Sequence, residues 1–288
     1  MRLLGNEAIA RGAIEAGVAF ASTYPGTPSS EISLALFQMS HESDLYFEYS
    51  TNEKVALEVA AGAANSGVRT MCMMKHVGLN VAADPLMTLA YVGVKGPLVI
   101  ITADDPFMFS SQNEQDNRYY GKLSGLPVLE PSSVEEAKDM IKYAFDLSES
   151  LKEPVIFRTT TRINHSTGIV TLGGIHERVT KGAFKKDPMN FVTVPAVSRN
   201  LHIRLLENIK KSEEIAAGSA YNFSSGNGPW GIICNGVSYG YVSDAVSDLG
   251  ITAKVFPGVV FAWVTRLGDA SPVAGAAVQL RDGRGALL

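Results

Sequence analysis

An acidic residue, Glu53, occupies a position in this chain where a carboxylate could do chemistry. Residues 46–49 predict a short strand because they are mostly aromatic, and residues 54–67, rich in Ala and Gly, predict a helix. Glu53 then lies at a strand-to-helix corner, and open α/β sheets bind ligands at the carboxyl ends of their strands. Small side chains behind this carboxylate would allow close contact with a flat ligand and little water.

A purely structural interpretation of Glu53 stays open beside the catalytic one. Ser50 precedes Glu53 by three residues, which is the spacing of a capping box at a helix start. An acid in the first turn also suits the helix dipole. The local spacing alone favours the cap.

A second loop of interest follows the strand expected over residues 18–23. Residues 24–30 read Tyr-Pro-Gly-Thr-Pro-Ser-Ser, and they open a helix that reaches about Met39. Thr27 is placed to cap this helix, with Pro28 as its first residue. Free backbone donors there could hold an anion. A tight turn with a capped helix explains the same residues equally well.

A third loop, over residues 75–80, is expected to be a turn between a strand over 68–74 and a helix that ends at Tyr91. It contains His76. The imidazole could contact a ligand, although a histidine in a turn is commonly held by an ordinary hydrogen bond.

The elements that position these loops alternate between strands and helices. Further strands are expected over residues 97–103, 126–129 and 154–159, and helices over residues 6–16 and 133–148. Short connections between alternating strands and helices predict a doubly wound, mostly parallel sheet. The order of the strands in that sheet does not follow from the pattern.

Three segments are expected along the chain. Residues 1–160 form the α/β domain, and residues 161–227, where periodicity fails, form a linker that wraps its surface. Residues 228–288 start a second α/β domain with a strand over 231–235, a helix over 239–249 and a strand over 251–256. Beyond Pro257 the pattern loses its period, so the second domain is predicted to be truncated, or read in an altered frame.

Composition excludes several classes of protein. The 288 residues carry a net charge of −4, which argues against a nucleic-acid partner. The longest apolar stretch is interrupted by Lys95-Gly96-Pro97, and no signal peptide is recognisable, so no membrane span and a cytoplasmic location are expected. Cys72 and Cys234 lie far apart in apolar runs and are predicted to be buried thiols.

Common catalytic motifs are absent or misplaced. No clustered Cys or His residues predict a metal site, and the only Gly-x-Gly-x-x-Gly, residues 226–231, precedes a strand where a dinucleotide site would open a helix. Residues 236–240 match the nucleophile elbow Gly-x-Ser-x-Gly, but no His follows His202 to complete a hydrolase triad. Ser238 is therefore expected to cap a helix.

The three loops together resemble a known family. Residues 24–30 resemble the Tyr-Pro-x-Thr-Pro-Ser-Ser signature of thiamine-diphosphate-dependent 2-oxoacid:ferredoxin oxidoreductases, and Glu53 matches the acid of their pyrimidine-binding domain. The likeness is strongest to the α subunits of indolepyruvate:ferredoxin oxidoreductases. Three runs carry it, namely residues 74–85, 103–106 and 110–118. It covers about residues 1–255.

The resemblance implies a catalytic role for Glu53. In such enzymes a Glu hydrogen-bonds the pyrimidine ring and favours the imino tautomer of the cofactor, which requires a poorly hydrated carboxyl that shares a proton. Pro25, Gly78 and Asn80 are the other cofactor contacts that the resemblance implies. Gly26, Thr27 and His76 are the implied substrate contacts. His76 and Asn80 either touch the ligand or only shape their turn.

The resemblance also implies the reaction and its partners. Aryl-pyruvates such as indolepyruvate would be decarboxylated oxidatively to acyl-CoA, with CoA as acceptor, ferredoxin as electron acceptor and a β subunit as partner. Pyruvate enzymes of the family place an Arg where this chain has Asp104-Asp105, which disfavours pyruvate. The same chemistry on pyruvate or 2-oxoglutarate, or a non-catalytic module that binds another subunit, are the alternatives.

Part of the family's site has no counterpart in this sequence. The Gly-Asp-Gly motif that holds diphosphate and Mg²⁺ is not matched, since Gly268-Asp269-Ala270 and Asp282-Gly283 lack its context, and the cysteines of the 4Fe–4S clusters are missing. The resemblance therefore implies a chain that holds half of a thiamine diphosphate site and is inactive alone.

Overall fold

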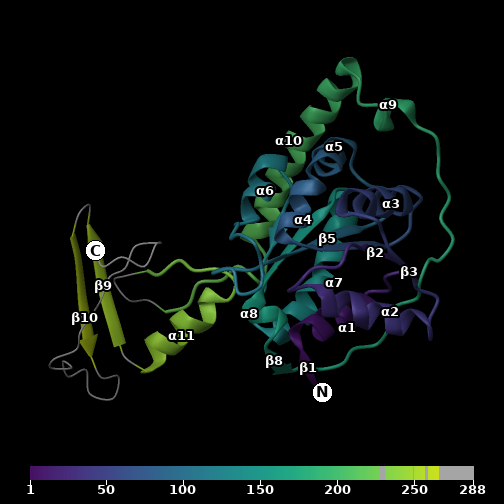
Figure 1. The fold of residues 1–288 in the computed structure, drawn as a ribbon. Coiled ribbons are helices and arrows are strands. Elements are labelled where there is room, and N and C mark those ends of the chain that lie inside the picture. Colours follow the sequence, from purple (N-terminus) through teal and green to yellow (C-terminus); the bar gives the residue numbers. More distant parts are fainter. Residues whose placement is uncertain (227–230, 249, 257–258, 266–288) are drawn as a thin grey trace. The chain divides into compact units, whose positions relative to one another are not determined.

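The computed structural model describes residues 1–226, 231–248, 250–256 and 259–265 (Figure 1). The chain divides into two compact units, Met1–Phe223 and Ser224–Leu288, which are considered separately. Among the described residues, no helix is both long enough and apolar enough to cross a membrane.

The first unit is built on a six-stranded sheet in which every neighbouring pair of strands is parallel. The strand order is β3-β2-β4-β5-β7-β6. The strands are β2 (Phe20–Thr23), β3 (Tyr46–Tyr49), β4 (Thr70–Lys75), β5 (Leu98–Asp104), β6 (Val128–Leu129) and β7 (Val155–Thr160). The predicted doubly wound parallel fold is therefore confirmed for this unit.

Helices cover both faces of the sheet (Figure 1). One face carries α1 (Gly5–Glu15), α2 (Ser30–Ser40) and α7 (Val134–Leu151). The other carries α3 (Glu53–Asn65), α4 (His76–Val81), α5 (Ala83–Val92), α6 (Arg118–Ser124) and α10 (Pro195–Ala217). Every residue of β5 and β7 is buried, as expected for central strands covered on both faces.

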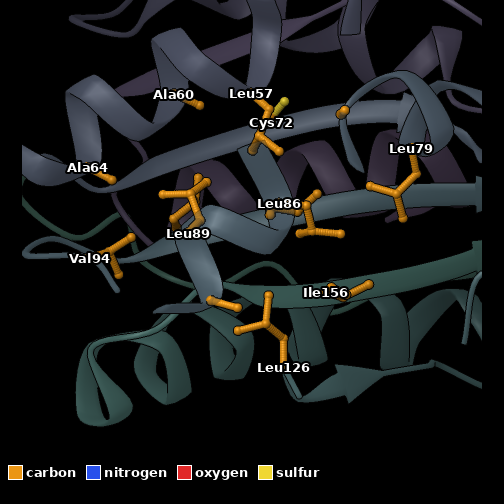
Figure 2. Close-up of a cluster of buried hydrophobic side chains, with 14 of the residues drawn as sticks. Leu57, Ala60, Ala64, Cys72, Leu79, Leu86, Leu89, Val94, Leu126 and Ile156 are labelled. Atoms are coloured by element: carbon orange, nitrogen blue, oxygen red, sulfur yellow. The ribbon is translucent and has the colours of Figure 1, made fainter. Parts of the chain in front are cut away.

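The small residues of α3 allow that helix to pack closely on the sheet. Ala60 and Ala64 face β4 and α5 in an apolar cluster that includes Cys72, Leu86 and Leu89 (Figure 2). Because these side chains are short, α3 packs close to the strands. This packing sets the position of the first residue of α3 relative to the carboxyl edge of the sheet.

The amino terminus of the first unit is joined to the segment after β7 by a short antiparallel ribbon. β1 (Arg2–Leu4) pairs with β8 (Thr167–Ile169), and the amino group of Met1 donates to the carbonyl of Val170 at 2.7 Å. Between them, α8 (Thr161–Asn164) follows β7 directly. Residues 170–187 then run without regular structure to α9 (Pro188–Phe191).

The irregular segment contacts other parts of the first unit. The Gly173 amide donates to the Glu15 carboxylate at 2.7 Å, and the Ala183 amide donates to the Ser66 carbonyl at 2.8 Å. The boundaries predicted for the three segments of the chain stay predictions.

The second unit differs from the βαβ arrangement that the sequence predicts. α11 (Ser238–Asp248) is followed by β9 (Gly250–Phe256) and β10 (Val259–Thr265), which pair antiparallel. Residues 231–235 form no strand, so that prediction is wrong. Ile233 is fully exposed, so the apolar run on which the prediction rested is not packed into a core. Cys234 is accordingly half-buried, whereas Cys72 is buried as predicted.

Two predictions concern residues outside the described part of the chain. Residues 257–258 include Pro257, after which the sequence was expected to lose its period. Residues 266–288 include Gly268-Asp269-Ala270 and Asp282-Gly283, which were compared with the diphosphate motif. The strand β10 was not predicted.

Candidate functional site

Three parallel strands end beside one another at the carboxyl edge of the sheet. β3, β2 and β4 end at Tyr49, Thr23 and Lys75, and β2 lies between the other two. The chain leaves β2 towards β3 and then returns to the opposite side, at β4. This reversal is the topological switch point at which open α/β sheets bind ligands. The loops after these strands are the three that the sequence singles out.

Glu53 is the first residue of α3 but does not serve as its cap. Asn52 is the N-cap, in extended conformation, and its side-chain oxygen accepts from the Val55 amide at 2.9 Å. The Ser50 hydroxyl donates instead to Glu48 at 3.1 Å. The predicted capping box is therefore wrong, because Asn52 supplies the oxygen that the helix start needs.

The Glu53 carboxylate is buried without a protein partner. Its residue is 8% exposed, and no residue in the described part of the chain forms a hydrogen bond or an ion pair with its oxygens. A Cβ on Gly78 would lie 2.6 Å from Glu53 Cγ and 2.7 Å from Oε1. The carboxylate therefore lies against bare backbone, and its acceptor positions are free for a donor from a ligand.

The thiol of Cys72 lies behind this carboxylate in β4. Burial raises the pKa of Cys72 to about 12, and the nearby charge of Glu53 adds to that effect while a hydrogen bond with Ser22 opposes it. A thiol with so high a pKa stays protonated and is no nucleophile. Cys72 therefore belongs to the core, as its position in the apolar cluster indicates.

The loop after β2 is closed by Ser29. The Ser29 amide and hydroxyl both donate to the Gly26 carbonyl at 2.9 Å, and the Thr27-Pro28 peptide bond is cis. α2 begins at Ser30 with Ser29 as its N-cap. The prediction that Thr27 caps this helix is wrong, because the turn at Gly26 and Ser29 delays the helix start. Thr27 stays exposed, as does Pro25.

A buried amide holds this loop from below. The Asn6 side chain donates to the Pro28 carbonyl at 2.8 Å and to Glu31 at 2.7 Å, and it accepts from Asn164 at 2.5 Å. Asn6 lies within α1, whose first residue is Gly5. Its side chain fixes the position of the loop that contains Thr27.

Lys75, at the end of β4, covers the same loop from the other side. A Cβ on Gly26 would lie 2.8 Å from both Cγ and Cδ of Lys75, so the aliphatic part of the lysine lies across the glycine. Its ammonium donates to Gln112 Oε1 at 3.0 Å. Lys75 thus connects the loop after β2 with the segment after β5.

The segment over residues 110–118 packs on α4. The prediction of a turn over residues 75–80 is wrong, because α4 starts at His76. The His76 ring is fully buried, and its Nε2 lies 3.0 Å from the Asn113 carbonyl. The Asn80 amide donates to Gln115 at 2.8 Å and its oxygen accepts from the Tyr120 hydroxyl at 2.6 Å. These partners favour the role of shaping α4 over direct ligand contact for both residues.

A buried ion pair anchors this segment to the sheet. Asp104 accepts from Arg158 Nε at 2.8 Å and from the Asn117 amide at 2.9 Å. Burial raises the pKa of Asp104, while Arg158 and the Asn117 amide lower it. Arg158 also donates to Glu130 at 2.5 Å. Asp104 is therefore part of the framework.

The neighbouring acid, Asp105, is also engaged within the protein. Its carboxylate accepts from the Ser110 amide at 2.9 Å and from the Thr161 hydroxyl at 2.8 Å. Partial burial opposes ionisation, but these hydrogen bonds outweigh it and lower the pKa of Asp105. Both acids at the end of β5 thus have partners of their own.

Two contacts join residues at this site. Glu53 contacts Gly78, and both residues were predicted. Gly26, a predicted residue beside Thr27, contacts Lys75. Lys75 was not among the predicted site residues, although it belongs to the motif that contains His76. Within the residues that the structure describes, no group of three or more His, Cys, Asp or Glu side chains is arranged to hold a metal ion.

The fold and the site together define an open α/β domain with a buried, unpaired carboxylate at its switch point. Residues 11–197 match the family model described as pyruvate flavodoxin/ferredoxin oxidoreductase, thiamine diphosphate-binding. The chain belongs to this family.

Several curated relatives have closely similar sequences. The chain is 51% identical over 256 residues to the indolepyruvate oxidoreductase subunit IorA of Methanothermobacter thermautotrophicus, covering 88% of this chain and 41% of that protein. It is 52% identical over 259 residues to the protein of the same name from Archaeoglobus fulgidus, covering 88% and 42%. The chain thus spans about two fifths of the length of these relatives.

More distant relatives share the fold. The 2-oxoglutarate synthase subunit KorA of M. thermautotrophicus is 31% identical over 179 residues, covering 58% of this chain and 46% of that protein. The solved 2-oxoglutarate:ferredoxin oxidoreductase from Magnetococcus marinus superposes with a TM-score of 0.64 at 16% identity. That superposition covers 86% of this chain and 51% of the solved one, and it supports the α/β fold described above.

Proposed function

We propose that this chain supplies the pyrimidine-binding half of a thiamine diphosphate site in an oxidoreductase that decarboxylates aryl-pyruvates such as indolepyruvate. The observation that carries the proposal is the Glu53 carboxylate, buried at the switch point without a protein partner and against bare backbone at Gly78. Membership of the family supports thiamine diphosphate as the ligand.

The residues present fit that cofactor. A buried carboxylate with free acceptor positions suits a ring nitrogen that must be hydrogen-bonded and share a proton, because such a group costs free energy unless a ligand satisfies it. Gly78 keeps the space beside Oε1 open for a flat ring. When bound, thiamine diphosphate would supply the electron sink that takes up the electron pair left on the 2-oxoacid carbon when CO₂ departs. The proposed task of Glu53 is to orient the ring and hold its proton.

The other predicted residues have different roles in this proposal: some contact the cofactor or the substrate, and others hold α4 in place. Pro25 and Gly78 line the cofactor, and Gly26 and Thr27 face the substrate, since Thr27 is exposed beside the switch point. His76 and Asn80 hold α4 in place through their contacts with residues 110–118.

The aryl-pyruvate assignment is supported by two observations. Relatives named for indolepyruvate are 50–52% identical, whereas those named for 2-oxoglutarate are 30–31% identical. The family's pyruvate enzymes carry an Arg where this chain has Asp104 and Asp105, and both acids are engaged in hydrogen bonds here. A bulky apolar side chain could instead be bound by burial.

The complete enzyme is proposed to use CoA and ferredoxin, together with a β subunit in the cytoplasm. Mg²⁺ and 4Fe–4S clusters are assigned to parts of that enzyme outside this chain. The predicted segments are retained: residues 1–160 as the pyrimidine-binding domain, 161–227 as the wrapping linker and 228–288 as the start of a second domain. With half of the cofactor site, the chain alone is expected to be inactive.

A substitution of Glu53 tests this function. In the assembled oxidoreductase that carries this sequence, Glu53→Gln should reduce ferredoxin reduction by roughly 10²-fold or more, because the carboxylate can no longer hold the proton. Proton exchange at C2 of bound thiamine diphosphate should fall in parallel. Glu58→Gln is the matched control, since Glu58 lies on the same helix with a side chain 53% exposed.

Substrate comparison separates the alternatives. Turnover of indolepyruvate and phenylpyruvate should exceed that of pyruvate and 2-oxoglutarate. Normal C2 exchange in Glu53→Gln would exclude the proposed role of Glu53, and preference for pyruvate or 2-oxoglutarate would replace the aryl-pyruvate assignment. Failure of the wild-type assembly to bind thiamine diphosphate in calorimetry would favour a non-catalytic module.

A further inference from the structure

One cation at the switch point has no counter-charge from the protein. The Lys75 ammonium has a neutral partner, Gln112 Oε1, at 3.0 Å. No Asp or Glu among the residues that the structure describes lies within ion-pair distance of it. By contrast, Lys54 is paired with Asp84 at 2.8 Å and Lys138 with Glu15 at 3.0 Å.

The nearest acidic residues along the sheet edge do not neutralise Lys75. Lys75 is the partner of Ala103 in the register of β4 and β5, so Asp104 and Asp105 follow immediately beside it. Asp104 is paired with Arg158, and Asp105 accepts from Ser110 and Thr161. The ammonium therefore keeps its charge available to a ligand.

The path of the lysine side chain directs this charge to the substrate loop. Cγ and Cδ of Lys75 lie across Gly26, where any larger residue would displace them, and Gly26 precedes Thr27. Beyond Cδ only two bonds remain to the nitrogen, so the ammonium stays beside this loop. Gln112 holds it from the side of β5.

We propose that Lys75 binds the carboxylate of the 2-oxoacid substrate. This inference rests on the proposed function and deepens it. A lysine offers one compact charge on a flexible stem, whereas an arginine clamps a carboxylate in a fixed plane. Lys75 can therefore hold the carboxylates of bulky 2-oxoacids whose side chains shift within the site.

Equilibrium binding of substrate-like acids tests the role of Lys75 without turnover. In the assembled enzyme loaded with thiamine diphosphate, 3-arylpropionate should bind more tightly than 3-arylpropionamide, and Lys75→Met should abolish that difference. The acid should lose roughly tenfold or more in affinity, while the amide changes little, because only the acid loses a charged partner. Lys75→Arg should restore part of the preference.

A substitution of the neighbour gives an independent test. Gln112→Glu places a carboxylate on Lys75 that competes with the ligand, so KM for the 2-oxoacid should rise with a smaller effect on kcat. Gln112→Leu removes only the hydrogen bond and should change KM less. Lys95→Met serves as the control, because Lys95 is exposed and precedes β5 at the opposite edge of the sheet.

The outcomes distinguish this inference from the proposed function. An acid-to-amide preference unchanged in Lys75→Met overturns the role of Lys75, whether or not the wild-type enzyme turns over 2-oxoacids. A loss of thiamine diphosphate affinity with the preference retained also overturns it, since the charge would then serve the cofactor. Absence of 2-oxoacid turnover in the wild type, with the preference abolished in Lys75→Met, counts against the proposed reaction alone.

Discussion

The Glu53 carboxylate contacts the backbone of Gly78 across the carboxyl end of β2, although neither residue follows that strand in the sequence. A Cβ on Gly78 would lie 3.0 Å from Glu53 Cδ and 2.7 Å from Oε1. Glu53 follows β3 and Gly78 follows β4, with β2 between them in the sheet. The position of the Glu53 carboxylate thus depends on the absence of a side chain at Gly78.

Gly78→Ala should impair the site without unfolding the protein. The added methyl group must displace the carboxylate, so 2-oxoacid turnover should fall by roughly 10-fold to 100-fold, as expected for a catalytic group moved by about 1 Å. Affinity for thiamine diphosphate, measured by calorimetry, should fall as well. Gly62→Ala in α3 is the control, because no atom lies within 4 Å of its added methyl group. Unchanged turnover in Gly78→Ala would show that the contact is dispensable.

Asn6→Ala should loosen the loop that contains Thr27. The substitution leaves the buried Asn164 amide and the Pro28 carbonyl without a partner, so the free energy of unfolding should fall by about 1–3 kcal/mol. KM for the 2-oxoacid should rise at the same time. Asn222→Ala, which removes an exposed hydrogen bond, should change stability by less than about 0.5 kcal/mol. A stability loss in Asn6→Ala with KM unchanged would show that this amide does not position the loop.

Arg158→Met should be more damaging than removal of both partners of the buried ion pair. Alone it leaves Asp104 buried with a charge and no counter-ion, at a cost of about 3–5 kcal/mol. The double variant Asp104→Asn/Arg158→Met should recover part of this loss, because a neutral amide is easier to bury. Urea unfolding at pH 7 measures both. Equal losses in the two variants would contradict the ion-pair interpretation.

Glu153 should make stability depend on pH. Burial raises the pKa of Glu153 from 4.5 to about 7, against opposing effects of Asn208, Arg204 and Lys211 in α10. The folded state therefore holds a proton that the unfolded chain releases, and stability is lost as pH rises from about 4.5 to 7. Glu153→Gln should be more stable than the wild type at pH 8 by at least about 1 kcal/mol, and the advantage should shrink at pH 4.5. Parallel stability curves for the two proteins between these pH values would contradict this prediction.

The alternation of apolar strands with helices was sufficient to predict the fold of the first unit. β5 is mostly apolar and is buried throughout, so its sequence leaves few alternatives. The strand over residues 231–235 was predicted on the same grounds and does not form, because a strand depends on a neighbour that its own sequence does not specify. The order β3-β2-β4 could not be predicted for the same reason.

The candidate site was predictable where the motif itself carried the chemistry. Glu53 and Thr27 were singled out by the resemblance of their loops to a family, and their roles stay predictions. The helix caps could not be predicted. Ser50 and Asn52 are both good capping residues, and only the backbone conformation decides that Asn52 is used. Lys75 was not predicted as a site residue, because its proposed role depends on contacts with Gly26 and Gln112. Both residues are far from Lys75 in the sequence.

The packing of α1 against α7 has a consequence for how the chain is made. α1 ends at Glu15, whereas α7 spans Val134–Leu151, and the two helices pack together on one face of the sheet. During synthesis the apolar face of α1 has no native partner until α7 has left the ribosome. At typical elongation rates that interval is on the order of ten seconds. The apolar face of α1 in the nascent chain is thus without its native cover for that time.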